Sequence, residues 1–112
     1  MKVDVLAVPR DEGFGMTLVV SAVNAADGAP LDGLSASNFR VTVIQGPSGW
    51  AGGEVLKIDS GIFAPSPGVY AFAVGEGNSK LKPGSYTLAV AVTGSQGGTA
   101  LHGQTLATAI MK

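Results

Sequence analysis

The chain has 112 residues, which is enough for one domain with its own core, spanning residues 1–112, but not for two. Charged residues make up only 13% of it and the formal net charge is -1, so no basic surface is available for nucleic acid and we predict no such partner. The absence of cysteine excludes disulfides and thiol chemistry, and the single histidine and scattered carboxylates form no metal-binding motif. We therefore predict no metal, no cofactor and no catalytic residue, and expect a neutral surface that contacts other proteins.

The N-terminal segment predicts neither a signal peptide nor a membrane anchor. Its short apolar stretch is broken by Asp4 and Pro9. No apolar run in the chain approaches the ~18 residues that a membrane-spanning helix requires, so we expect no membrane insertion. The sequence leaves the compartment undetermined: outside the cell or at its surface if the chain is a domain of a secreted parent, and the cytoplasm otherwise.

Short runs with period-two alternation recur along the chain and are separated by clusters of Gly and Pro. The 17 glycines and 6 prolines would interrupt helices, while the β-branched and aromatic residues favour strands. The spacing of these runs is typical of an all-β protein, and their number suits a seven-stranded antiparallel β-sandwich of the immunoglobulin-like kind. We expect strands over residues 3–8, 16–24, 38–45, 54–58, 69–74, 85–93 and 99–111.

Alternation within these runs assigns the side chains that face the core. The clearest case is SYTLAVAVT, in which large apolar residues alternate with Thr and Ala. The third and fifth predicted strands place aromatic residues on the same side as their valines. We expect the core to contain Phe39, Val41, Val43, Tyr70, Phe72, Val74, Tyr86, Leu88, Val90 and Val92.

The connection between the second and third predicted strands is rich in turn residues. Asp27 and Pro30 suit a tight turn, and Leu34 is expected to plug the end of the sandwich before Phe39 enters the core. Asp27 and Asp32 offer two carboxylates in one loop, but Ca²⁺ needs six to eight oxygens. Local Asx hydrogen bonds are therefore the favoured interpretation, and the following SASN predicts one helical turn.

Two stretches resemble bacterial immunoglobulin-like and transthyretin-like modules. VVSAVNAADGAPLDGLSASNFRVTV is similar to their sequence of a strand, a D-G-x-P turn, a hydrophobic-Gly-Leu step and a Phe-led strand. LKPGSYTLAVAV is similar to their P-G-x-Y-x-L-x-V strand entry, in which Tyr86 packs its ring inside and hydrogen-bonds its hydroxyl to the backbone. The resemblance implies a β-sandwich and supplies no catalytic residue, because such modules serve as stalks, spacers, binding domains and enzyme appendages.

Some modules of this kind form an internal cross-link between a lysine and an asparagine or aspartate. Such a cross-link needs a buried Lys57 or Lys80 beside a carboxylate. Lys57 lies between Leu56 and Ile58 in mid-strand, and on an amphipathic strand that is the ordinary outward position. We therefore interpret Lys57 as a surface residue.

Trp50, in the loop GPSGWAGG, is the first candidate binding residue. An aromatic ring between Gly and Ser at a loop tip can stack on a sugar or insert into a protein partner. The alternative is a ring that folds back over the end of the sandwich. A carbohydrate-binding function would further require Trp50 and Tyr70 to be exposed along one groove.

The last two predicted strands supply the second candidate. If their hairpin turns through Ser95 to Gly97, one face collects uncharged and mostly small residues, while His102 lies opposite Val90 on the core side. The alternative for this face is that the strands twist so that intramolecular loops cover it. The alternative for His102 is that it makes a binding contact. The predicted face contains Thr87, Ala89, Ala91, Leu101, Gly103, Thr105, Ala107 and Ala109.

These observations favour a non-enzymatic protein-binding or structural module of a larger assembly or surface protein. Its predicted contact residues are Trp50, Ala89, Ala91, Thr105 and Ala107. The expected partner is a protein, and one candidate is a second copy of this chain, bound through the last hairpin. The alternative is a carbohydrate-binding appendage of a secreted enzyme. An enzyme is the least favoured class, because no nucleophile, metal cluster or cofactor loop is present in the sequence.

Overall fold

The computed structural model describes residues 1–11, 15–47, 52–58, 62–75 and 81–112, which form β-strands and one short 3₁₀ helix, η1 (Ala36–Asn38). This confirms an all-β chain and the helical turn predicted at SASN. No described helix is long and apolar enough to cross a membrane. The strands are β1 (Val3–Asp11), β2 (Met16–Asn24), β3 (Phe39–Gln45), β4 (Val55–Ile58), β5 (Phe63–Ser66), β6 (Val69–Gly75), β7 (Gly84–Val92), β8 (Ser95–Gln96), β9 (Thr99–Ala100) and β10 (Gly103–Met111).

Four of these strands depart from the sequence prediction. β5 was not predicted; it contains Pro65 and is exposed along its whole length, as is common at the edge of a sheet. β8 was also missed, and the last predicted strand is divided into β9 and β10. The prediction of seven strands is therefore too low for the described part of the chain.

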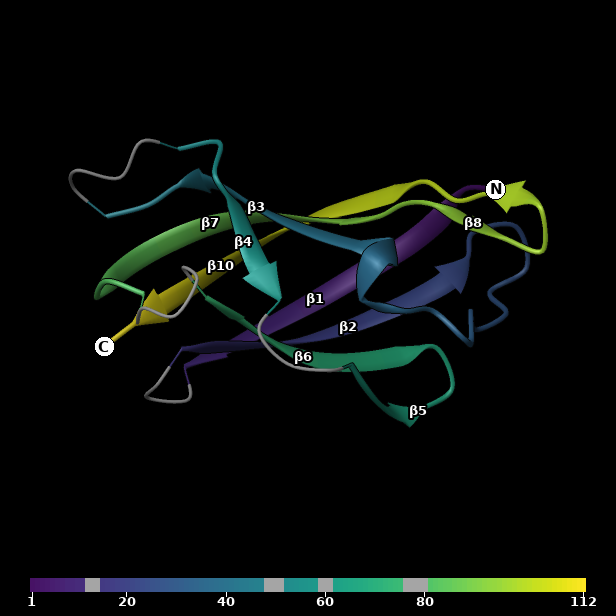
Figure 1. Ribbon diagram of the computed structural model, residues 1–112, viewed down its shortest axis with the longest axis horizontal. Coiled ribbons are helices and arrows are strands. Elements are labelled where there is room, and N and C mark those ends of the chain that lie inside the picture. The colour runs from purple at the N-terminus through teal and green to yellow at the C-terminus, as the bar shows by residue number, and fades with distance from the viewer. Residues whose placement is uncertain (12–14, 48–51, 59–61, 76–80) are drawn as a thin grey trace.

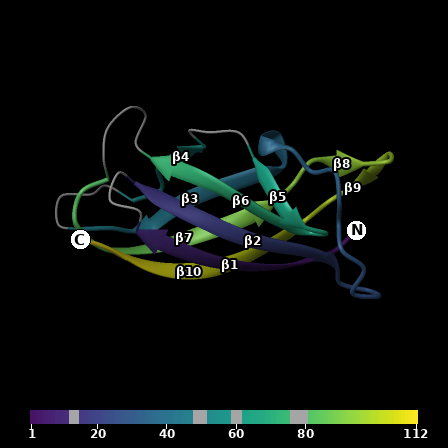
Figure 2. The same cartoon turned by 90° about the horizontal axis from the view of Figure 1, so that it is seen from below.

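The main strands form one antiparallel sheet that curls until it is nearly a closed barrel (Figure 1). Its order is β1-β2-β6-β4-β3-β7-β10, and β5 pairs with β6 along the edge opposite β2. β4 belongs to both halves, because Val41 pairs with Leu56 on one side of it and Ile58 pairs with Val74 on the other. The core lies between the half formed by β1, β2 and β6 and the half formed by β3, β7 and β10 (Figure 2).

Alternating side chains fill this core as the sequence predicted. The inward residues of β7, from Tyr86 to Val92, are at most 1% exposed. The rings of Phe39, Tyr70 and Phe72 pack together, with centroids 5.3 Å and 5.2 Å apart for the two pairs that include Phe39. The expected core face of each of these strands is therefore confirmed.

The connection between β2 and β3 is fixed by both local and tertiary hydrogen bonds. The backbone N–H of Ala29 donates to the Asp27 carboxylate at 2.9 Å, which confirms the predicted Asx interaction. Leu34 is 8% exposed and plugs the end of the core, as expected. The Tyr70 hydroxyl donates to the Leu31 carbonyl at 2.5 Å and accepts from the Leu34 N–H at 3.2 Å, so β6 holds this connection against the core.

The carboxylates of Asp27 and Asp32, which the sequence analysis judged too few for calcium, have different partners. Asp32 accepts a hydrogen bond from the backbone N–H of Gly68 at 2.9 Å, which ties the connection to the turn between β5 and β6. Asp27 bonds within its own turn. The described residues contain no group of three or more side chains suited to a metal ion.

The last hairpin turns at a different place from the predicted one. Gly97 and Gly98 form its tip with φ of 57° and 82°, and two consecutive positive φ values are typical of a type I′ turn. Gly103 consequently pairs with Val92 and Thr105 pairs with Val90. Compared with the prediction, the register is displaced by an odd number of residues, and such a displacement turns every side chain of β10 to the opposite face.

This register corrects the predicted face of uncharged, mostly small residues on the last two strands. Ala89 and Ala91 point away from the core, but Thr105 and Ala107 lie opposite Val90 and Leu88 and share their inward face. Ala107 is 8% exposed. The prediction that these four residues share one surface is therefore wrong, and the outward residues of β10 are Gln104, Leu106, Thr108 and Ile110.

Candidate binding surface

β1 and β10, which form the two ends of the sheet order, lie side by side and run in the same direction (Figure 2). We call this junction the seam. At its start, the Val3 N–H donates to the His102 carbonyl at 2.8 Å and the His102 N–H donates to the Met1 carbonyl at 3.1 Å. At its end, the Lys112 N–H donates to the Asp11 carboxylate at 2.8 Å. Between these contacts, no ladder of paired residues joins the described lengths of the two strands.

Gly103 allows the two strands to approach at the start of the seam. A Cβ atom added at this position would lie 2.2 Å from the Val3 carbonyl oxygen and 2.9 Å from the Val3 Cβ. No side chain can be accommodated at these distances without moving the backbone. A glycine at the first position of β10 is therefore what brings β10 against β1.

Large apolar side chains lie exposed on the outer side of the seam. Leu6 and Val8 are 70% and 59% exposed on β1, and Leu106 and Ile110 are 64% and 68% exposed on β10. Counted along the parallel strands from the Lys2–His102 bridge, Leu6 and Leu106 occupy corresponding positions. We call these four residues the seam surface.

Alternation within β1 and β10 places these side chains outside. In β1, Val3 and Val5 are buried, so Leu6 and Val8, which follow them at the alternate positions, face outward. In β10, the buried Ala107 and Met111 place Leu106 and Ile110 outside. Both strands carry apolar residues on both faces, whereas a strand with one solvated face normally alternates apolar and polar residues.

The sequence contained a signal for this surface that our prediction did not use. VLAVP in β1 is apolar at five consecutive positions, and successive residues of a strand point to opposite sides. At least two of these apolar side chains must therefore face away from the core. To predict the outward residues of β10, the position of the Gly97–Gly98 turn was needed as well.

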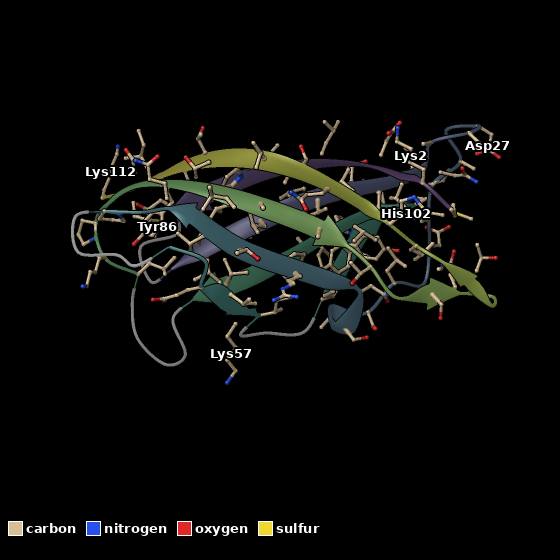
Figure 3. All side chains as sticks on the ribbon, turned by 90° about the horizontal axis from the view of Figure 1, so that it is seen from above. Lys2, Asp27, Lys57, Tyr86, His102 and Lys112 are labelled. Carbon is tan, nitrogen blue, oxygen red and sulfur yellow. The ribbon has the colours of Figure 1, made fainter. Side chains whose placement is uncertain are left out.

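A groove of about 570 Å³ lies at the start of the seam. Lys2, which precedes β1, and Asp4 and Leu6 of β1 line it from one side, and His102 and Gln104 line it from the other side of the seam. Figure 3 shows Lys2 and His102 close to this end of the molecule, with Lys112 at the opposite end and Lys57 on the far side. The groove is thus continuous with the seam surface through Leu6.

The groove does not bring a nucleophile and a base together. Ser21 and His102 both line it, but Ser21 pairs with Leu6, four residues further along β1 than Lys2, which bridges to His102. Four residues of a strand span ~13 Å, far beyond the reach of a hydrogen bond. These two side chains are therefore not arranged for acyl transfer.

His102 is exposed. The expectation that it faces the core is wrong because the hairpin register differs from the predicted one. Lys57 is exposed as expected, and no carboxylate is buried among the residues that the structure describes. Tyr70 is 2% exposed, so it does not line a surface groove as the carbohydrate alternative required. Trp50 and Lys80 lie outside the described residues.

The hydroxyl of Tyr86 donates to the Lys82 carbonyl at 2.6 Å while its ring is 1% exposed. The ring thus lies inside and the hydroxyl bonds the backbone, as the P-G-x-Y stretch predicted.

Comparison with known proteins finds no matching family model, no matching curated protein and no matching solved structure.

Proposed function

We propose that this chain is a non-enzymatic protein-binding or structural module that contacts other proteins through the seam surface. The observation that carries the proposal is the concentration of exposed, large apolar side chains on two adjacent strands. A leucine at 70% exposure beside another at 64% is unfavourable in water, and contiguous apolar patches on a folded domain commonly mark contact sites. The low fraction of charged residues, 13%, is consistent with a surface that meets protein.

We further propose that the fold is an immunoglobulin-like sandwich. The neighbour orders β1-β2-β6-β5 and β3-β7-β10 correspond to the ABED and CFG sheets of that fold. The hydrogen bond from the Tyr86 hydroxyl to the backbone four residues upstream supports the same proposal, because a tyrosine at the start of strand F makes this kind of contact in immunoglobulin-like domains. β4, which pairs with both halves, is the link through which these two sheets are continuous here.

Site-specific photo-crosslinking tests the proposed function. A photo-reactive amino acid in place of Leu106 is expected to give discrete protein adducts in the cells from which the chain comes. The same residue in place of Phe63, which is 66% exposed on β5, is the matched control and is expected to give none. Equal labelling at the two positions, or no protein adduct at Leu106, would show that the seam surface is not a protein-binding site.

A further inference from the structure

The outward residues of β1 have a charge pattern that is complementary to itself when reversed. Asp4 precedes the apolar pair Leu6 and Val8, and Arg10 follows it, with one inward residue between each outward one. A negative charge therefore lies at one end of the apolar pair and a positive charge at the other, at equal distances from its centre. Turning the strand end to end exchanges the two charges.

We propose that two copies of this chain associate face to face through the seam surface, related by a twofold axis that crosses β1 between Leu6 and Val8. This inference rests on the proposed protein-binding function and names its partner. Antiparallel stacking of the two β1 strands places Leu6 of each copy on Val8 of the other. Asp4 of each copy then meets Arg10 of the other, so that both ends of the apolar contact carry an ion pair.

The charges distinguish this arrangement from the other way of stacking the same faces. If the twofold axis ran along β1, Asp4 would meet Asp4 and Arg10 would meet Arg10. Such juxtaposition of like charges is unfavourable at an interface from which water is excluded. The sequence of β1 therefore selects the antiparallel arrangement.

The neighbouring strands are compatible with it. The outward side chains of β10 are Gln104, Leu106, Thr108 and Ile110, and those of β2 opposite β1 are Thr17, Val19, Ser21 and Val23. None of them is charged, so either strand can lie against its copy without repulsion. The same reversal brings Leu106 onto Thr108 and Gln104 onto Ile110 of the other copy.

Sedimentation velocity of the purified full chain tests the proposal. We expect a species of twice the 11.2 kDa chain mass, converted to monomer by Leu106→Lys and retained in the matched control Phe63→Lys. Arg10→Asp is expected to weaken association at least tenfold, and the reversed pair Asp4→Arg with Arg10→Asp to restore it. Circular dichroism checks that each variant is folded.

Cysteine pairing tests the register directly, since the chain has no cysteine of its own. Mixing Leu6→Cys chains with Val8→Cys chains under mild oxidation is expected to give a disulfide-linked dimer, and each variant alone to give far less. Preferential linkage of each variant to itself would overturn the antiparallel arrangement. A strictly monomeric wild-type chain at roughly 1 mM would overturn the dimer, and discrete photo-adducts of Leu106 with a different protein would then leave the proposed function standing.

Discussion

The two halves of the sheet meet at two places, and they are joined there by different means. At β4 the junction is a hydrogen-bonded ladder, because this strand pairs with β3 through Leu56 and with β6 through Ile58. At the seam the junction is one bridge between Lys2 and His102 at the start and a hydrogen bond from Lys112 to Asp11 at the end, with the two strands side by side between them. The ladder pairs β4 with one strand of each half on its side of the molecule, whereas the seam has a groove and exposed apolar residues in place of a ladder on the other.

The sequence explains why the seam is not a ladder. Val3 donates its N–H toward β10, and by alternation Pro9 has its nitrogen on the same edge of β1. Proline has no N–H to donate, so a continuous ladder along this edge would lack a bond there. Proline on an edge strand also discourages pairing with foreign strands, which is consistent with association through the face and not the edge.

The largest expected effect concerns the β4 junction. Leu56→Ala removes a side chain that is 4% exposed in the core, and we expect the free energy of unfolding to fall by about 3 kcal/mol through lost burial and the cavity left behind. Urea denaturation followed by circular dichroism measures it. Val55→Ala, at a neighbouring residue that is 50% exposed, should change it by less than about 0.5 kcal/mol. Equal losses in the two variants would mean that β4 does not contribute to the core.

The comparison also shows which parts of the molecule were predictable. The alternation of β3, β6 and β7 identified these strands and their buried faces, because burial of one face imposes a period of two. The ladder at β4 was not predictable, since its partners Val41 and Val74 are separated from it in sequence and many pairings satisfy the same alternation.

Prediction of the residues that β10 contributes to the seam surface depended on the position of the hairpin turn. GSQGG offers several turns, and placing the tip at Ser95 to Gly97 gave a register with His102 inside and a small-residue face outside. A type I′ turn needs two residues with positive φ, which Gly97 and Gly98 supply. That one displacement exchanged the faces of β10, so the surface could be inferred only once the tip was known.

A smaller effect is expected at the seam itself. Gly103→Ala introduces a methyl group 2.2 Å from the Val3 carbonyl oxygen, so β1 and β10 must separate at their start. We expect a loss of about 2 kcal/mol in the free energy of unfolding, typical of overpacking against backbone. Gln104→Ala, one residue further along and exposed, serves as the control and should leave stability unchanged. An unchanged Gly103→Ala variant would show that the strands are not in close contact there.

The last prediction involves no substitution and concerns the hydrogen-exchange rates of neighbouring backbone amides. NMR measures these rates at a concentration below the range of association. Thr105 and Ala107 lie on the edge of β10 that bonds β7, because the Leu101 N–H donates to the Gly94 carbonyl and the pattern repeats every second residue. Leu106 and Thr108 present their N–H groups to the seam instead. We expect the first pair to exchange at least about 100-fold more slowly than the second. Equal protection of the four amides would mean that β1 and β10 form a ladder, in which case the two junctions would be alike and the strand edges at the seam would be closed.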